Sequence, residues 1–166
     1  MINKKVEKAL IDQIEIEEVA SRFYMAAASW CEVKGYPGAA KFLYKHSDEE
    51  RMHMIKLIRY VNDKGGHATL KKLDIPDVKY DSLLNIFEKI FTHEQAVTKS
   101  INKLFENAFN DKDYTTSQFL HWYIEEQIEE ERMFKGILDK FRLAGNQAGG
   151  LFLLDKELDS MAAVSK

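Results

Sequence analysis

The sequence predicts an all-α protein, a bundle of four long helices followed by a short fifth helix. Apolar residues recur at steps of three and four through long stretches and do not alternate as in a half-buried strand. The 166 residues include only two prolines. Most of the eight glycines fall where one helical pattern stops and the next begins, which is typical of residues that end helices.

The first two helices are expected to form a hairpin. Asn3 can cap a first helix over roughly residues 4–34, whose apolar positions follow helical spacing. A glycine-containing turn follows, and Pro37 is tolerated in the first turn of a second helix over roughly residues 37–64. Two consecutive glycines then stop that helix.

Two more long helices and a short one complete the prediction. The third is expected over roughly residues 82–109, with Asp81 or Ser82 as its cap, and the fourth over roughly 114–144. The segment after the fourth helix is too apolar for a free tail. We therefore expect a fifth helix over roughly 151–161, docked on the bundle or on another subunit.

The connection between the second and third helices is unlike the others. Residues 65–80 lack helical periodicity and contain Pro76, whereas the other two connections are tight turns. Extended at about 3.3 Å per residue, this segment could cross roughly 50 Å. A helix of roughly 30 residues is about 45 Å long. The segment is therefore long enough to cross the whole bundle. Because loops of this length are uncommon without such a task, we expect one long crossover connection and not a simple up-down-up-down bundle.

Composition limits the possible functions. One domain, residues 1–166, is long enough to bury a core without disulfides, and 45% of its residues are hydrophobic and 31% charged. A net charge of −3 gives no electrostatic reason to expect nucleic acid or an anionic membrane as partner. The single cysteine, Cys31, is interpreted as a small buried hydrophobe. With no apolar run long enough to span a bilayer and no signal segment, the protein is expected to be cytoplasmic.

Each long helix carries a carboxylate on its predicted buried stripe. The apolar seam of the third helix, for example, is interrupted by Glu94 alone. A buried carboxylate without a partner is costly, so acids at four such positions need an explanation. The polar seam residues are Glu17 in the first helix, Glu50 and His53 in the second, Glu94 in the third, and Gln127 and Glu130 in the fourth.

The spacing of these residues puts them at one height. Glu17 and Glu50 are 33 residues apart, and so are Glu94 and Gln127. Residues equidistant from the turn of an antiparallel hairpin lie level with each other, so both pairs are level. In each hairpin a second polar residue follows three positions later, His53 in the first and Glu130 in the second.

Such a set of side chains suits metal ions. Ionised carboxylates gathered in a core repel one another unless they are protonated or bound to cations. Carboxylate oxygens with an imidazole nitrogen suit iron, manganese or zinc, and this number of acids suits two metals that share a bridge. The alternative is a helical oligomer without catalytic activity, in which the acids form a polar layer that fixes the helix register.

Several aromatic and histidine residues lie near this layer. Tyr24 is two turns from Glu17 on the same face, so it is interpreted either as a core aromatic or as a hydrogen-bond donor or electron source beside the metals. Trp122 is assigned to packing. His46, His93 and His121 receive no role.

Taken together, these motifs resemble the bacterial non-haem ferritins, a ferritin-like di-iron family, over nearly the whole chain. The resemblance implies one iron held by Glu17, Glu50 and His53. It implies a second iron held by Glu94 and Glu130, with Glu50 bridging the two and Gln127 close by. The motifs that carry the resemblance are Glu17 with Tyr24, Glu49-Glu50-x-x-His53, Glu94, and Glu126-Gln127-x-Glu129-Glu130.

The resemblance also implies a function. It implies iron storage with ferroxidase activity, in which Fe(II) is oxidised to Fe(III) by dioxygen or hydrogen peroxide and the ferric mineral is stored in a cage of twenty-four chains. Tyr24, Glu50, His53 and Glu130 would take part in the reaction. A third iron is implied near Glu49, Glu126, Glu129 and Glu130. A di-iron oxidase or peroxidase that stores no mineral is the alternative within this class.

One departure from a sister family bears on cofactors. In bacterioferritin the methionine that binds haem directly follows the bridging glutamate. This chain has Arg51 at that position, and Met52 is one residue further on. We therefore expect no haem.

Overall fold

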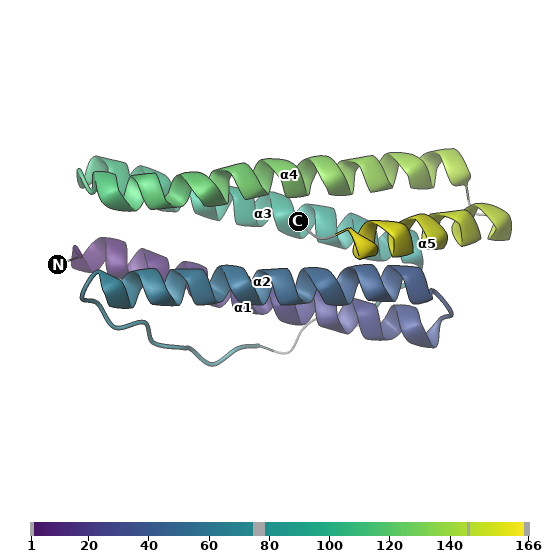
Figure 1. The fold of residues 1–166 in the computed structure, drawn as a ribbon, viewed down its shortest axis with the longest axis horizontal. Coiled ribbons are helices and arrows are strands. Elements are labelled where there is room, and N and C mark those ends of the chain that lie inside the picture. Colours follow the sequence, from purple (N-terminus) through teal and green to yellow (C-terminus); the bar gives the residue numbers. More distant parts are fainter. Residues whose placement is uncertain (1, 75–78, 146, 165–166) are drawn as a thin grey trace.

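The computed structural model describes residues 2–74, 79–145 and 147–164. These residues form five helices and no strand. Figure 1 shows the four long helices side by side, with the short one packed across one end of the bundle. The helices are α1 (Lys4–Val33), α2 (Pro37–Asp63), α3 (Leu83–Asn110), α4 (Tyr114–Ala144) and α5 (Ala148–Ala163).

The helix starts have the local chemistry that the sequence predicts. The Asn3 side chain accepts a hydrogen bond from the amide of Lys5. Ser82 rather than Asp81 caps α3, accepting from the amide of Asn85 at 3.0 Å. Pro37 stands in the first turn of α2, where the missing amide hydrogen costs nothing.

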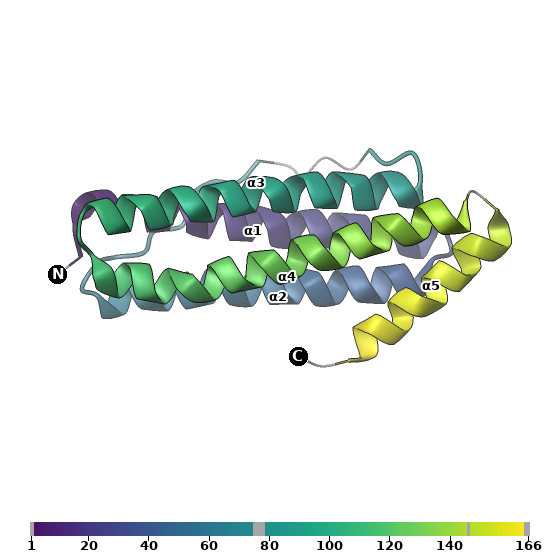
Figure 2. The same ribbon diagram turned by 90° about the horizontal axis from the view of Figure 1, so that it is seen from above.

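The two hairpins are joined by the long crossover. Its described parts lie along the outside of the bundle, so that α3 starts at the same end as α2 and runs in the same direction (Figures 1 and 2). Lys71 holds this segment to α1 through Asp12 and Glu15, at 2.6 Å and 2.8 Å. All of these groups are substantially exposed, so the ion pairs orient the segment more than they stabilise the fold.

The fifth helix begins at Ala148, three residues earlier than the sequence predicts, and so includes two glycines expected to precede it. A side chain at Gly150 would lie 2.6 Å from the carbonyl oxygen of Ala144, so glycine permits the tight return from α4. Asp155 of α5 is buried and accepts hydrogen bonds from the amides of Gly38 and Ala39. It thereby caps the N-terminus of α2 from another helix.

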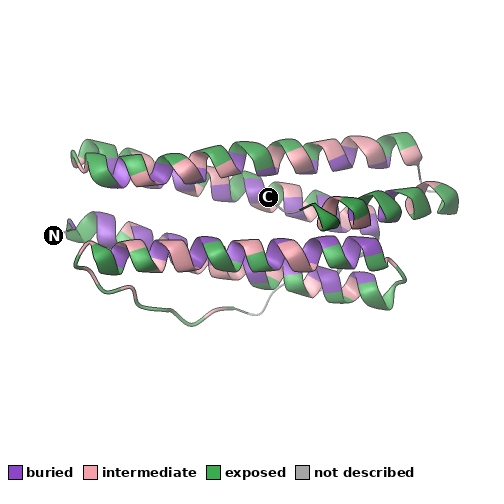
Figure 3. Cartoon of the chain, in the orientation of Figure 1, coloured by how far each residue is buried: buried purple, intermediate pink, exposed green. Residues whose placement is uncertain are grey.

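Buried positions lie on the inward faces of the long helices (Figure 3). They form two apolar clusters separated along the bundle axis. The cluster on the α5 side contains Tyr24, Phe87 and Phe134, and the cluster on the N-terminal side contains Leu10 and Leu57. None of the described helices is long and apolar enough to cross a membrane. Burial raises the pKa of the Cys31 thiol to about 12, which leaves it unreactive.

Candidate metal centre

A polar layer lies between the two apolar clusters. Its six side chains come from all four long helices, and each residue is 6% exposed or less. They are the residues that the seams and the spacing of the sequence put at one height. The polar layer consists of Glu17, Glu50, His53, Glu94, Gln127 and Glu130.

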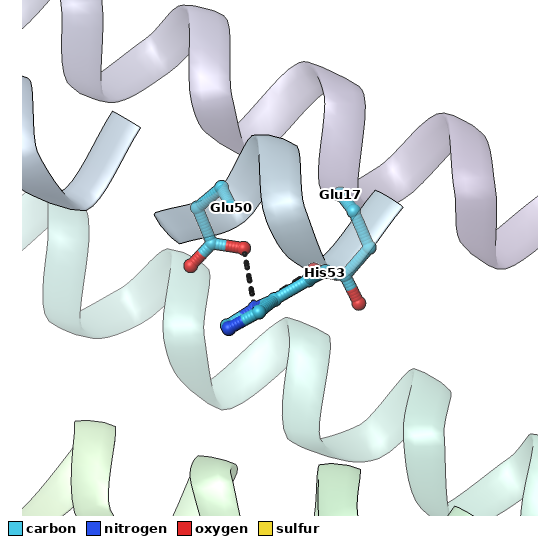
Figure 4. A group of neighbouring side chains, drawn as sticks. All are labelled: Glu17, Glu50 and His53. Carbon is cyan, nitrogen blue, oxygen red and sulfur yellow. Dashed lines mark ion pairs between the residues drawn. The ribbon is translucent and has the colours of Figure 1, made fainter. Parts of the chain in front are cut away.

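One part of the polar layer joins α1 to α2 (Figure 4). Nδ1 of His53 lies 3.2 Å from Oε2 of Glu50 and 3.9 Å from Oε2 of Glu17. Glu50 and His53 are three residues apart in one helix, so both side chains leave the same face. Each of the three residues offers one ligand atom within 4.8 Å of the others. An ion bound here would have two carboxylates and one imidazole as ligands.

Burial has a large effect on the acidity of these two carboxyl groups. Burial, followed by the charge of Glu50, raises the pKa of Glu17 well above its usual range. Burial and the charge of Glu94 raise the pKa of Glu50 in the same way. Protonated acids must lose their protons to bind a metal, so metal binding here is coupled to proton release.

Glu94 differs from Glu17 and Glu50 because hydrogen bonds stabilise its ionised form. The Tyr24 hydroxyl donates to its Oε1 at 2.7 Å, and Nε2 of Gln127 donates to its Oε2 at 3.1 Å. Burial would raise the pKa of Glu94, but nearby His93 and these two donors outweigh it and keep the pKa below its usual value. Glu94 is therefore the acid of the layer that stays ionised most readily.

Glu130 belongs to a further group. Nδ1 of His46 lies 3.1 Å from Oε2 of Glu49 and 3.8 Å from Oε2 of Glu130. These three residues also offer ligand atoms within 4.8 Å of one another. Sequence reasoning gave His46 no role. Its position on the buried stripe of α2, one turn before Glu50, was the available signal.

A buried amide next to Glu17 was missed as well. Nε2 of Gln13 donates to Oε1 of Glu17 at 2.8 Å, and the hydroxyl of Ser100 donates to Oε1 of Gln13 at 2.7 Å. The Gln127 amide has a comparable partner on α3, since it also donates to the Thr98 hydroxyl at 3.3 Å. Two amides therefore hold two carboxylates of the layer, and hydroxyl groups of α3 contact both amides.

A groove of about 750 Å³ between α2 and α4 leads to the polar layer. His53 and Glu49 reach it from one side, and Glu126 and Trp122 line the other. Oε2 of Glu126 is 4.0 Å from Nε2 of His53. The Trp122 ring meets His53 edge-on, with ring centroids 5.2 Å apart. Trp122, which the sequence assigns to packing, therefore packs against a residue of the polar layer.

The remaining predicted acid is placed differently. Glu129 is exposed, and it belongs to neither of the two groups of potential metal ligands found among the described residues. The adjacent buried residues of α4, Gln127 and Glu130, point into the bundle. The acidic run of α4 is thus divided between the core, the groove and the solvent.

Buried carboxylates from four long helices, with a histidine three residues after one of them, define a class of protein. It is the class of four-helix bundles that bind paired metals in the core between facing helices. Comparison with known proteins makes this specific: residues 7–144 match the family model described as ferritin-like domain. The chain belongs to the ferritin family.

Relatives and solved structures agree over the full length. The bacterial non-heme ferritin of Campylobacter jejuni subsp. jejuni serotype O:2 is 43% identical over 166 residues, covering 100% of this chain and 99% of that protein. The bacterial non-heme ferritin of Escherichia coli O157:H7 is 38% identical, covering 97% and 98% of the two chains. An open-pore ferritin from the archaeon Archaeoglobus fulgidus superposes with a TM-score of 0.95 at 36% identity, covering 99% and 100%.

Proposed function

We propose that this chain is the subunit of an iron-storage cage that oxidises Fe(II) to Fe(III). The observation that carries the proposal is the polar layer, in which acids from every long helix and one histidine are buried together between apolar clusters. The relatives named bacterial non-heme ferritin support iron as the substrate.

We assign the first iron position to Glu17, Glu50 and His53, which are grouped within ligand distance. The second position takes Glu94 and Glu130, with Glu50 shared between the two ions and Gln127 beside them. A metal with anionic oxygen ligands is stabilised in its higher charge state, so these acids favour Fe(III) over Fe(II).

The reaction uses one electron from each ion. Two Fe(II) ions become two Fe(III) ions, while dioxygen accepts both electrons and two protons and leaves as hydrogen peroxide. With hydrogen peroxide as oxidant, the same two electrons and two protons give two water molecules. Protons released by Glu17 and Glu50 when the metals bind are available for this step, because burial raises the pKa values of both groups.

Tyr24 orients the second position in this scheme. Its hydroxyl holds one oxygen of Glu94 at 2.7 Å, which leaves the carboxylate fixed before metal arrives. The buried Tyr24 ring is also close enough to the polar layer for a redox role, in which its phenol would supply an electron to the reaction there.

A third iron position is proposed at the groove side of the layer. The resemblance implies Glu49, Glu126, Glu129 and Glu130 for it. In the structure Glu49 and Glu130 both approach Nδ1 of His46, Glu126 is half-buried near His53, and Glu129 is exposed. We expect Glu49 and Glu130 to contribute most.

Storage requires a closed shell. Phe152 and Leu153 of α5 are 61% and 69% exposed, an apolar surface that assembly would cover. We expect a homo-oligomer of twenty-four chains in the cytoplasm, with Fe(II) and an oxidant as its small-molecule partners.

Stopped-flow absorbance after addition of Fe(II) tests the proposal. Glu50→Ala and Glu130→Ala should each slow Fe(III) formation at least tenfold, because each removes a ligand from the layer. Glu125→Gln, an exposed position of α4, is the matched control and should leave the rate unchanged. Oxidation by both alanine variants at the wild-type rate would contradict the assignment.

Particle mass and iron content after aerobic loading separate the alternatives. A storage cage should retain many iron atoms per chain in a large particle. A di-iron oxidase without storage would retain only the two or three ions of its sites, and a polar layer that serves register alone would retain none.

A further inference from the structure

Two side chains outside the polar layer extend its hydrogen bonds between α3 and α4. The Thr98 hydroxyl donates to Oε1 of Glu131 at 2.6 Å, and both residues are partly buried. Nε2 of Gln127 donates to the same hydroxyl at 3.3 Å. Thr98 lies one turn after Glu94 in α3, and Glu131 lies one turn after Gln127 in α4. Glu131 is thus connected to the layer through the Thr98 hydroxyl.

The Glu131 carboxylate decides which way the proton of Thr98 points. A hydroxyl group has one proton to donate, whereas an ionised carboxylate can only accept. The 2.6 Å separation is typical of a hydrogen bond from a hydroxyl to a charged oxygen. Because its proton is directed to Glu131, Thr98 acts only as an acceptor toward the Gln127 amide.

The Gln127 amide is held through its nitrogen. Nε2 lies 3.1 Å from Oε2 of Glu94 and 3.3 Å from both the Glu94 carbonyl oxygen and the Thr98 hydroxyl. The two ends of an amide have nearly the same shape, so hydrogen-bond partners decide which end faces which neighbour. Since these acceptors all take the nitrogen, the carbonyl oxygen Oε1 is on the other branch of the planar group. It can serve as a neutral oxygen ligand for a cation.

The Gln13 amide shows the opposite arrangement. It also donates from Nε2 to a carboxylate of the layer, Glu17, at 2.8 Å. Here, however, the Ser100 hydroxyl donates to Oε1 at 2.7 Å, so the carbonyl oxygen is already used. Each amide therefore meets a hydroxyl of α3, but one hydroxyl donates and the other accepts. The acceptor is Thr98, whose proton is taken by Glu131.

We propose that Glu131, acting through Thr98, is a positioning residue that keeps the Gln127 carbonyl oxygen for the second metal position. Loss of the Glu131 carboxylate releases the Thr98 proton, which can then bond to Oε1 of Gln127 and turn this oxygen away from the metal. Neither Glu131 nor Thr98 has to contact the ion. The ligand role of Gln127 rests on the proposed function, in which Glu94 and Glu130 hold the second ion.

Anaerobic calorimetric titration of the assembled, metal-free protein with Co(II) tests this role. Glu131→Leu should lower the affinity of the second position about tenfold, as substitution of groups that orient metal ligands does. Glu131→Gln removes the charge but keeps an oxygen acceptor for Thr98, so its affinity should stay within about threefold of wild type. Glu125→Leu, at an exposed position of α4, is the matched control and should bind Co(II) as wild type does.

Thr98 supplies a second comparison. Thr98→Val removes the proton that Glu131→Leu would release. The double variant should therefore bind the second Co(II) more tightly than Glu131→Leu alone, whereas two independent residues would give additive losses. In a Gln127→Leu background, which lacks the amide oxygen, Glu131→Leu should cause no further loss. Circular dichroism and particle mass check that each variant is folded and assembled.

The positioning role and the proposed function fail in different ways. An unchanged second affinity in Glu131→Leu, an additive loss with Thr98→Val, or a further loss in the Gln127→Leu background would each overturn the positioning role and leave the metal centre intact. A loss in Glu131→Gln as large as that in Glu131→Leu would overturn it too, because the charge alone would then matter. No Co(II) bound by wild type would overturn the proposed function, and the positioning role with it.

Discussion

The Gln13 amide allows a quantitative test of how the layer is organised. It donates to Oε1 of Glu17 at 2.8 Å, and both residues are 1% exposed. In the variant Gln13→Leu the side chain keeps a similar volume, so the α1 packing is preserved while the donor is lost. Ser100, which donates to Gln13, is only half-buried and can turn to water instead.

The expected magnitude follows from the charge of the acceptor. Glu17 must be ionised to bind a metal, and a hydrogen bond to a charged group contributes about 1.5–3 kcal/mol. At about 1.4 kcal/mol per factor of ten, this corresponds to a fall of roughly 10–100-fold in metal affinity. Substitution of groups that orient metal ligands costs a similar amount in other proteins. Ser100→Ala removes only the bond that orients the amide, so its effect should stay below about tenfold.

Calorimetric titration with Zn(II) at fixed pH measures both effects directly. Gln13→Leu should lower affinity for the first position, and in steady-state oxidation it should raise KM for Fe(II) more than it lowers kcat. Circular dichroism and particle mass serve as checks on folding. If correctly folded Gln13→Leu binds Zn(II) within threefold of wild type, the amide does not position Glu17.

Three further predictions concern the rest of the layer and the fold. Tyr24→Phe removes a hydrogen-bond donor to Glu94, so the pKa of Glu94 should rise. The affinity of the second metal position for Co(II), measured by calorimetry, should then fall about tenfold. The two acids beside His53 have pKa values raised by burial, so the folded metal-free protein binds more protons than the unfolded chain above the pH where free glutamate titrates. Glu17 and Glu50 should therefore make the folded protein more stable as pH falls from 7 toward 5. Replacing both by glutamine should change how Tm depends on pH, and an unchanged dependence would contradict the prediction. Gly38→Ala would put a Cβ atom 1.9 Å from a backbone oxygen of α5 and should lower stability by about 1–3 kcal/mol in denaturant unfolding, whereas Gly136→Ala meets no atom within 4 Å and should not destabilise.

The position of the layer explains how this fold tolerates so many buried acids. Apolar clusters on both sides supply the burial that stabilises the bundle, so the polar layer can be kept for binding. Within the layer, hydrogen bonds lower the pKa of Glu94 and stabilise its ionised form. Burial raises the pKa values of Glu17 and Glu50, which favours their protonated forms in the absence of metal. The layer therefore combines one acid that hydrogen bonds keep ionised with two acids that must release protons before they bind a cation.

Sequence alone determined the helices and the height of the layer. Helical periodicity marks the buried stripe of each helix, and antiparallel hairpins set residues that are equidistant from a turn level with each other. The 33-residue spacings from Glu17 to Glu50 and from Glu94 to Gln127 could therefore be converted into one bundle level. Capping at Asn3 and Ser82 was equally predictable, because it depends on residues only two or three positions away.

Tertiary structure decided which atoms meet within that layer. Gln13 and Ser100 are 87 residues apart, and Asp155 and Gly38 are 117 apart, so their contacts depend on how whole helices rotate and pack. His46 shares the buried stripe with Glu50, but only the surrounding aromatic rings direct its Nδ1 toward Glu49 and Glu130. Periodicity gives the side of a helix on which a residue lies, whereas side-chain direction depends on neighbours that are distant in the sequence.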